Sequence, residues 1–294
     1  MQKRDLADCH FPVSDIFKKV MTKSDFEPFK LSSEQVEHFH EFGYLTNVKI
    51  FEEEQVDILR QELTEIADPS HPKHDLFYEF HNNQSTDPDT VLFHSLGHWR
   101  MTPGFHDALW NPAFTQAASQ LLGDKSVRFW HDQLFCKPAN HGGVVAWHQD
   151  YSYWIRTIPM QHLTCWIGLD NATTENGCLN YIPGSHKWGL LKRLELGGEM
   201  EAIFEQLTEE QQAQIKPVPM ELKKGHACFH HPLMLHGSFE NKSQHSRRAL
   251  VLNVFADGTQ SNSDDVMLRG TNINIPKGQK MDGKFFPLLY QANN

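Results

Sequence analysis

A histidine and an aspartate two residues apart are the side chains of this sequence with the clearest chemical potential. His148 and Asp150 stand in the segment VVAWHQDYSYW, which is predicted to be a strand. Because successive side chains of a strand alternate between its two faces, this spacing directs both groups to the same face. His236 ends the apolar run of HHPLMLHGS and would project from another strand near the same place. The sequence therefore predicts a metal site of two imidazoles and one carboxylate.

This ligand set would leave about three coordination positions of a metal ion open. Such an arrangement is typical of non-haem Fe(II) oxygenases, in which a co-substrate and O2 bind the metal together. A closed structural zinc site would instead need a fourth protein ligand. A His and an Asp at this spacing also occur as a hydrogen-bonded surface pair, so the interpretation depends on the residues around them.

Two adjacent arginines, Arg247 and Arg248, begin a predicted strand eleven residues after His236. The planar guanidinium of an inward-facing arginine can hold a carboxylate through two hydrogen bonds, as the distal carboxylate of 2-oxoglutarate would require. Because the two residues are neighbours on one strand, only one of them can face the interior. The spacing from His236 favours Arg247, although alternation alone does not choose between them.

Four blocks of this sequence resemble the phytanoyl-CoA dioxygenase family of Fe(II)- and 2-oxoglutarate-dependent oxygenases, over roughly residues 33–256. The blocks are HQD at 148–150, ENGCL at 175–179 with IPGSH at 182–186, KG at 224–225 with HPLMLHGS at 231–238, and Arg247. The resemblance implies a double-stranded β-helix, a cupin-like jelly-roll barrel. It also implies that His148, Asp150 and His236 bind Fe(II), that Arg247 clamps 2-oxoglutarate, and that O2 is the oxidant.

The resemblance implies three further co-substrate contacts. Trp166 stands where the family has a tryptophan lining the 2-oxoglutarate pocket, Gln149 is the middle residue of the HQD block, and Gln133 occupies a strand position where relatives often carry Met. Ordinary β core is the alternative for Trp166. Simple alternation would point Gln149 away from the metal.

Several other polar residues near the blocks have structural roles as alternatives. Lys137 and Ser185 are candidates for contacts with carboxylate or hydroxyl groups, against solvent exposure for the lysine and a turn role for the serine. The family usually has Asp where this chain has His226, a change expected to affect a turn. His226, His230 and His231 are predicted to be structural residues rather than ligands of a zinc ion.

The elements that must position these groups are predicted to fall into a helical part at about 1–125, a β-helix core at about 126–256 and a C-terminal extension at 257–294. Apolar residues recur at helical spacing after Ser32, over 56–66 and over 112–122. Short β-type runs separated by turn residues occupy 127–136, 144–150, 162–169, 178–182, 218–222, 227–238 and 248–256. An acidic, helical insertion at 194–215 is expected to cross outside the β core. The chain is predicted to be one oxygenase domain, mainly β with flanking helices.

The composition disfavours several classes of protein. The 294 residues carry 27 Lys and Arg against 37 Asp and Glu, a net charge of −10, which disfavours nucleic acid and anionic membranes as partners. No run approaches the roughly 20 apolar residues of a membrane span, and the start lacks a signal peptide's apolar stretch, so we expect a cytoplasmic protein. The five cysteines contain no C-x-x-C pair and are expected to be reduced. The pattern specifies no oligomeric state.

We therefore predict a dioxygenase that hydroxylates a small organic substrate with release of succinate and CO2. Asp150 favours oxygenation over halogenation, because related halogenases have a small residue at this position. The aromatic wall of the substrate pocket, with Arg156 as its one cation, is expected from Trp130, His131, Tyr151, Tyr153 and Trp154. Two rival classes use the same three ligands, a zinc-bound cupin-like hydrolase or isomerase and a catalytically silent metal-binding protein. The zinc enzyme would give Arg247 no function.

Overall fold

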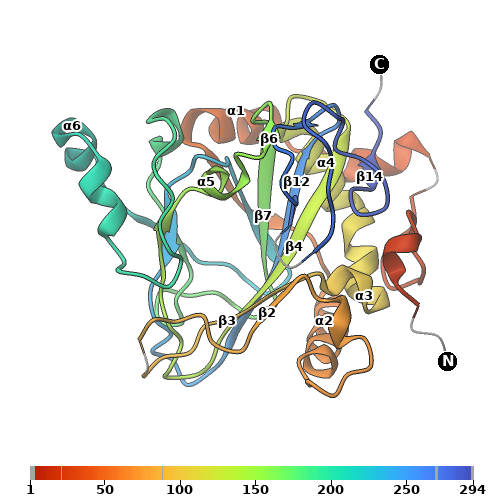
Figure 1. Cartoon of the computed structure of the whole chain (residues 1–294), viewed down its shortest axis with the longest axis horizontal. Helices are drawn as coiled ribbons and strands as arrows, with labels where there is room; N and C mark the ends of the chain where they lie inside the picture. Colours follow the sequence, from red (N-terminus) through yellow and green to blue (C-terminus); the bar gives the residue numbers. More distant parts are fainter. Residues whose placement is uncertain (1–3, 21, 88, 269–270, 293–294) are drawn as a thin grey trace.

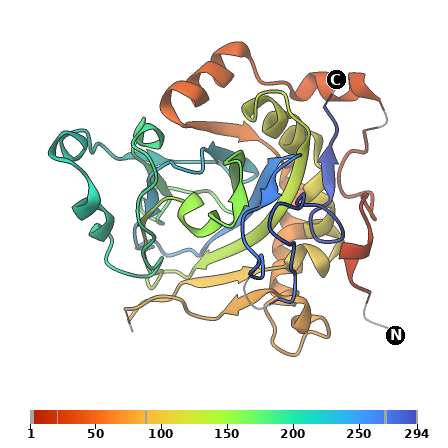
Figure 2. The same cartoon turned by 45° about the horizontal axis from the view of Figure 1, so that its top comes forward.

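Two antiparallel β-sheets facing each other form the centre of the molecule (Figure 1, Figure 2). The computed structural model describes residues 4–20, 22–87, 89–268 and 271–292. The larger sheet has the strand order β1 (Tyr44–Lys49), β10 (His226–His230), β7 (His162–Gly168), β12 (Arg247–Ala256), β4 (Val127–Lys137), β3 (Phe93–Leu96) and β2 (Glu79–His81), with β14 (Leu288–Tyr290) also paired to β4. The smaller sheet has the order β5 (Val145–His148), β11 (His236–Ser238), β8 (Leu179–Tyr181) and β9 (Val218–Met220), and β6 (Thr157–Ile158) pairs with β13 (Gln260–Ser261).

Helices cover the outside of the larger sheet, as Figure 1 shows for α2, α3 and α4. The α-helices are α1 (Ser33–Phe42), α2 (Glu53–Ile66), α3 (Pro103–Asp107), α4 (Pro112–Leu121), α5 (Tyr151–Trp154) and α6 (Glu209–Ala213). Short 3-10 turns occupy Leu6–Asp8, Lys23–Phe29, His74–Leu76, His98–Arg100, Ala108–Trp110, Ser185–Lys187 and Ala202–Gln206. None of the helices in these described stretches is long and apolar enough to cross a membrane.

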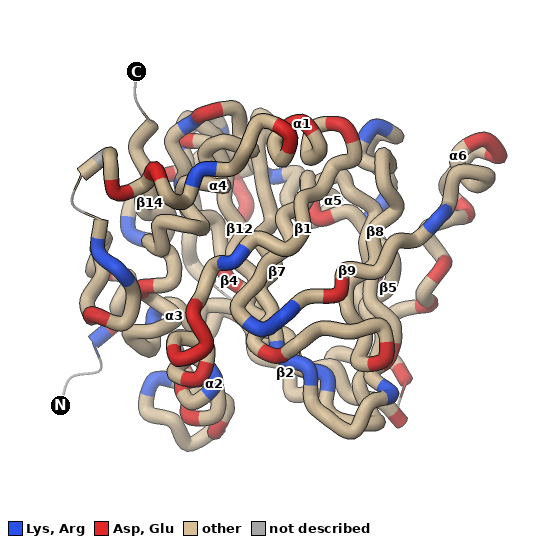
Figure 3. Tube along the Cα trace, turned by 180° about the vertical axis from the view of Figure 1, so that it is seen from behind, with Lys and Arg blue, Asp and Glu red and all other residues tan. Residues whose placement is uncertain are grey.

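Helices α1, α2 and α4 lie in the three segments where the sequence predicts helical spacing, whereas α3 and α5 were not predicted. Ser32 caps α1 by accepting a hydrogen bond from the backbone N–H of Gln35, and Gly43 ends it with a left-handed backbone at φ 84°. The buried residues of α2 are Val56, Leu59, Leu63 and Ile66, which form one apolar stripe at helical spacing. Figure 3 shows acidic residues on α1, α2 and α6, on the outside of the molecule.

Strand β12 shows how the larger sheet is buried on both of its faces. Leu250, Leu252 and Val254 belong to the hydrophobic cluster that includes the helices, whereas Ala249 and Val251 belong to the cluster between the sheets. This is the period-2 alternation of a strand with two covered faces. Arg247 has the same parity as Ala249 and Val251, so the strand directs it into the space between the sheets.

The expected division of the chain into a helical part and a β part is wrong in detail. Strands β1, β2 and β3 all precede residue 126 and join the larger sheet, and β14, from the C-terminal extension, pairs with the start of β4 on the same edge that β3 occupies further along. The strands β2 and β3 have only three and four residues, so they carry too little alternation to be recognised. The predicted run 227–238 divides into β10 and β11, which lie in different sheets, with Pro232 in the intervening turn.

Candidate metal centre

A cavity of about 530 Å³ lies between the two sheets, and residues of both sheets line it. His148 and His236 reach it from the smaller sheet, and Asp150 reaches it from the turn that follows β5. Arg247 reaches it from β12 on the opposite sheet. The sequence-predicted ligands and the predicted clamp thus open into one space.

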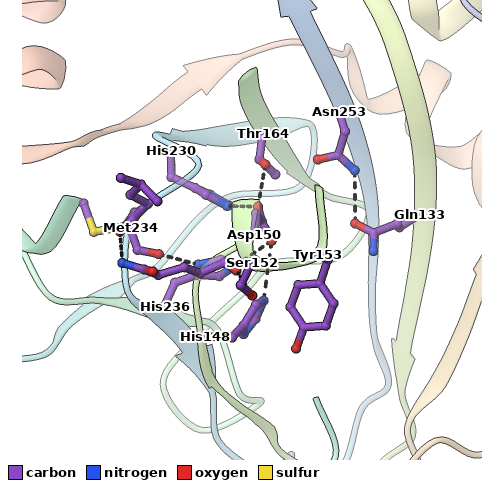
Figure 4. A network of polar contacts seen from close by, with 12 residues as sticks. Gln133, His148, Asp150, Ser152, Tyr153, Thr164, His230, Met234, His236 and Asn253 are labelled. Atoms are coloured by element: carbon purple, nitrogen blue, oxygen red, sulfur yellow. Dashed lines mark hydrogen bonds and ion pairs between the residues drawn. The ribbon is translucent and has the colours of Figure 1, made fainter. Parts of the chain in front are cut away.

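The two histidines and the aspartate converge (Figure 4). His236 on β11 pairs with His148 on β5 in antiparallel register, and their ring centroids are 4.1 Å apart. Asp150 Oδ1 is 3.5 Å from His148 Nε2 and 3.7 Å from His236 Nε2. One nitrogen or oxygen atom from each of these residues lies within 4.8 Å of the other two, so the set could hold a single metal ion.

The physical reason for the position of Asp150 differs from the predicted one. Strand β5 ends at His148, and Asp150, the residue before α5, has a right-handed helical backbone, φ −58° and ψ −43°. The turn from strand to helix, rather than strand alternation, brings the carboxylate beside the imidazole. The side chains of His148 and Asp150 therefore lie close together as predicted, but the predicted strand extends two residues too far.

Hydrogen bonds to backbone carbonyls fix the orientation of both imidazoles. His148 Nδ1 is 2.8 Å from the carbonyl oxygen of Ala146, and His236 Nδ1 is 2.9 Å from that of Met234. A carbonyl oxygen can only accept, so each Nδ1 carries a hydrogen, and each ring turns its Nε2 toward Asp150 Oδ1. Nε2 is therefore the nitrogen of each ring that would bind a metal.

Asp150 is held by hydrogen bonds to its second oxygen. Thr164 Oγ1 donates to Asp150 Oδ2 at 2.6 Å, and His230 Nε2 donates to it at 2.9 Å. The hydroxyl of Tyr181 lies 2.8 Å from His230 Nδ1 and can donate to that nitrogen. Burial alone would raise the pKa of Asp150, but His236, His148 and His230 outweigh it and hold the pKa well below its usual range. The carboxylate is therefore ionised, with Oδ1 left for a metal.

The sequence analysis gave His230 a structural role and did not reveal that it supports Asp150. The alternation of side chains along β10 could have indicated this role. His230 has the same parity as Cys228, which belongs to the cluster between the sheets. Thr164 could have been found in the same way, since it shares its face of β7 with Trp166.

Arg247 is buried, and its neighbour Arg248 is paired on the outer side of the sheet. Arg248 makes two hydrogen bonds of 2.8 Å to the carboxylate of Asp170. The guanidinium of Arg247 lies over the ring of Trp166, 5.2 Å from its centroid, and its Nε has no hydrogen-bond partner among the described residues. Burial lowers the pKa of Arg247 to about 10, which still leaves it charged at neutral pH. A buried cation without a carboxylate partner is able to bind an anion.

The three further predicted contacts divide into two that reach the cavity and one that does not. Trp166 and Gln133 both line it. Gln133 Oε1 accepts a hydrogen bond of 3.1 Å from Asn253 Nδ2 (Figure 4). The expectation for Gln149 needs correction, because its amide group points into the loop that follows residue 188. Its Nε2 donates to the carbonyl oxygens of Gly189 and Leu233, and its Oε1 accepts from the N–H of Leu191.

Lys137 and Ser185 hold the chain around His236 and do not line the cavity. Lys137 is buried rather than solvent-exposed, and its Nζ donates to Ser238 Oγ at 2.6 Å. Ser185 Oγ accepts from the N–H of Leu235 at 2.9 Å. These bonds fix the segments immediately after and before His236, so both residues act on its position.

The substrate side of the cavity carries more charge than predicted. The predicted aromatic residues Trp130, His131, Tyr153 and Trp154 line it, whereas the hydroxyl of Tyr151 is bonded to the carbonyl oxygen of Thr157. Arg156 lines the cavity as expected, and Arg193 adds a second cation that lies 4.6 Å from the ring centroid of Tyr153. Residues 195–197 also line the cavity, so the start of the predicted outer insertion reaches the site.

Comparisons with known proteins agree with this architecture. The model of the family described as Phytanoyl-CoA dioxygenase (PhyH) matches residues 39–249. A relative named phytanoyl-CoA dioxygenase from Arabidopsis thaliana is 29% identical over 270 residues, which cover 81% of this chain and 94% of the relative.

Solved structures with the same fold include two proteins of nogalamycin biosynthesis. The carbocyclase SnoK, described as non-heme and alpha ketoglutarate dependent, aligns with a TM-score of 0.70 and 19% identity over 88% of this chain and 96% of its own. The epimerase SnoN, in a complex with Fe3+, alpha ketoglutarate and nogalamycin RO, aligns with a TM-score of 0.71 and 17% identity over 91% of this chain and 100% of its own. These likenesses confirm the predicted cupin-like, double-stranded β-helix fold.

Proposed function

Because this chain belongs to the phytanoyl-CoA dioxygenase family and is a 2-oxoglutarate-dependent dioxygenase, we propose that it hydroxylates a small organic substrate and releases succinate and CO2. One observation carries this proposal further than any other. The same cavity contains a convergent set of two imidazoles and one carboxylate, His148, His236 and Asp150, and a buried arginine that no carboxylate of the described residues pairs with.

The residues present fit an Fe(II) ion in their chemistry. His148 and His236 would offer neutral Nε2 atoms, and Asp150 would offer the oxygen that Thr164 and His230 leave free. Two histidines and one carboxylate on one side of the ion would leave positions open toward the cavity. When bound there, Fe(II) with 2-oxoglutarate and O2 supplies an oxidant that inserts one oxygen atom into a C–H bond while the co-substrate becomes succinate and CO2.

Arg247 would bind the distal carboxylate of 2-oxoglutarate. Its guanidinium is buried over Trp166 and presents the planar donor pattern that matches a carboxylate. Gln133, on the neighbouring strand β4, would add a hydrogen bond from its amide group to the co-substrate or the substrate. The ion pair formed by Arg247 would be desolvated, so it would contribute strongly to affinity.

The remaining residues of the cavity would bind the substrate and exclude water. Trp130, Trp154 and Tyr153 supply aromatic surface beside the metal ligands, and the ring of Tyr153 lies 6.0 Å from that of His148. Such walls keep bulk water away from the reacting centre. A zinc-dependent hydrolase is the weaker alternative, because it would leave the buried charge of Arg247 without a partner.

A coupled turnover assay tests the proposal. The metal-free protein would be supplied with Fe(II), 2-oxoglutarate and air, and a panel of small organic acids, amides and aromatic metabolites would be screened for those that stimulate succinate formation. We expect a true substrate to yield one succinate for each product that has gained one oxygen atom. Succinate formation that never rises above the level of the metal-free protein would contradict the proposal.

A further inference from the structure

A second cluster of metal-binding side chains lies on the β2–β3 hairpin at the edge of the larger sheet (Figure 2). Glu79 and His81 stand two residues apart on β2, and His94 on β3 pairs with His81. One nitrogen or oxygen atom from each of the three lies within 4.8 Å of the other two. This cluster shares no residue with the first centre, although Glu79 and His94 line the same cavity.

His94 is the residue that makes this cluster more than a chance grouping of exposed side chains. It is only 3% exposed, its ring stacks on Phe135 with centroids 4.5 Å apart, and its Nδ1 has no hydrogen-bond partner among the described residues. A buried imidazole with one unpartnered nitrogen is a candidate metal ligand, because binding a metal would give that nitrogen the partner it lacks.

The surroundings of His94 also suit a ligating histidine. Its Nε2 lies 3.3 Å from the amide nitrogen of Gln133. Turning the amides of Gln133 and Asn253 over together would present the Gln133 oxygen to an N–H at His94 Nε2, which is the outer hydrogen bond that metal-ligating histidines make. The bond between the two amides would be kept, with Gln133 Nε2 donating to Asn253 Oδ1. The lone pair at Nδ1 would then be free for the metal.

The other two ligands are already adjacent and have room to adjust. His81 Nε2 lies 3.4 Å from Glu79 Oε2, and no lysine or arginine of the described residues pairs with that carboxylate. The side chains of His81 and Glu79 are 40% and 25% exposed, so they can rotate toward a metal that enters from solvent. The rings of His81 and His94 are nearly parallel, with centroids 6.1 Å apart, and His81 is the one free to turn.

We propose that Glu79, His81 and His94 bind a second divalent transition-metal ion, of the class of Zn2+, on the wall of the cavity. Two imidazoles and one carboxylate favour a borderline ion of this kind over Mg2+ or Ca2+. Three protein ligands leave a position that can take water or an anionic group of a bound molecule. The proposal is independent of the function proposed above, since the first centre contributes no ligand to it.

Counting bound zinc tests the proposal. Untagged full-length protein, freed of metal by a chelator, would be dialysed against Zn2+, and the metal retained per chain would be measured by mass spectrometry. We expect two equivalents for the wild type and for a His10→Ala control at an exposed histidine, and one equivalent for His81→Ala and for Glu79→Gln. Both substitutions lie at partly exposed positions, so they should leave the fold intact, which thermal unfolding would check.

The same measurement in a His148→Ala/His236→Ala background separates the two centres. We expect one equivalent of Zn2+ in that background and none when His81→Ala is added. Co2+ in place of Zn2+ should give visible d–d absorption in the background protein, and His81→Ala should abolish it. A single equivalent in the wild type, or a second equivalent that survives both His81→Ala and Glu79→Gln, would overturn the second site and leave the first unaffected.

Discussion

His148 and His236 are directly opposite each other on the antiparallel strands β5 and β11, with ring centroids 4.1 Å apart. Their approach is set by the register of the two strands. A slip of one residue would turn one imidazole to the other face of the sheet. Ser185 and Lys137 bond to the chain on either side of His236 and fix that register from outside the cavity.

Arg247→Ala should chiefly weaken the binding of 2-oxoglutarate. Breaking a desolvated charge pair costs about 2–5 kcal/mol, so the KM for 2-oxoglutarate should rise roughly 30-fold or more. The KM is obtained by measuring the rate of succinate formation at varied 2-oxoglutarate concentrations. Arg248→Ala is the matched control, because Arg248 is paired with Asp170 on the other side of the sheet, and its KM should stay unchanged. An equal rise in both variants would show that Arg247 is not the clamp.

His230→Leu should weaken Fe(II) binding without changing the set of ligands. The substitution removes the hydrogen bond of 2.9 Å to Asp150 Oδ2, and loss of such outer contacts typically costs about 10–100-fold in metal affinity. The dissociation constant for Fe(II), measured anaerobically by competition with a chelator, reports the effect. His231→Leu, at the next residue, should keep the wild-type affinity. Unchanged affinity in His230→Leu would rule out the positioning role.

Gln149→Ala should lower stability and leave co-substrate binding unchanged. The amide of Gln149 makes three hydrogen bonds to backbone groups of Gly189, Leu191 and Leu233, and each buried group left unpaired costs about 1–3 kcal/mol. The free energy of unfolding in urea should fall by at least about that amount, while the KM for 2-oxoglutarate stays within roughly twofold. If the KM of Gln149→Ala for 2-oxoglutarate rose as much as that of Arg247→Ala, Gln149 would have to contact the co-substrate, contrary to the structure.

The stability of the protein should fall as the pH is lowered from about 6.5 to 4. Burial lowers the pKa of His131 to about 4 and that of His162 to about 3, below the ordinary value of 6.5. The unfolded chain therefore binds more protons than the folded chain in this range, so stabilisation present above pH 6.5 is lost as pH falls, by about 1.4 kcal/mol per pH unit for each histidine. Urea unfolding at several pH values measures the slope. His162→Gln should reduce this slope. An unchanged slope in that variant would show that His162 does not contribute to the loss of stability at low pH.

The parts of the site that the sequence predicted are those encoded in short contiguous segments. His148 and Asp150 are two residues apart in the chain. Their side chains were therefore correctly expected to be close, although the predicted end of strand β5 was wrong. The orientation of Arg247 could be predicted only with the parity of the whole strand, which the burial of Ala249 and Val251 reveals.

The parts that the sequence did not predict depend on contacts between distant segments. His230 approaches Asp150 across 80 residues of chain, and Arg193 reaches the cavity because its loop is anchored by Gln149. The strands β2 and β3 were missed because three or four residues carry little periodicity, although they hold Glu79 and His94 on the cavity wall. Sequence spacing reports local geometry well, and it reports the pairing of remote elements poorly.

The most direct test of the proposed centre is an anaerobic titration followed by visible spectroscopy. Fe(II) and then 2-oxoglutarate would be added to the metal-free protein, with Asp150→Ala and Asp265→Ala, a substitution at an exposed carboxylate, measured alongside. We predict a charge-transfer band of the Fe(II)–2-oxoglutarate chelate in the wild type and in Asp265→Ala that bleaches when air is admitted, and no band in Asp150→Ala. No band in the wild type, or an equal band in Asp150→Ala, would contradict the assignment of His148, Asp150 and His236 as the Fe(II) site.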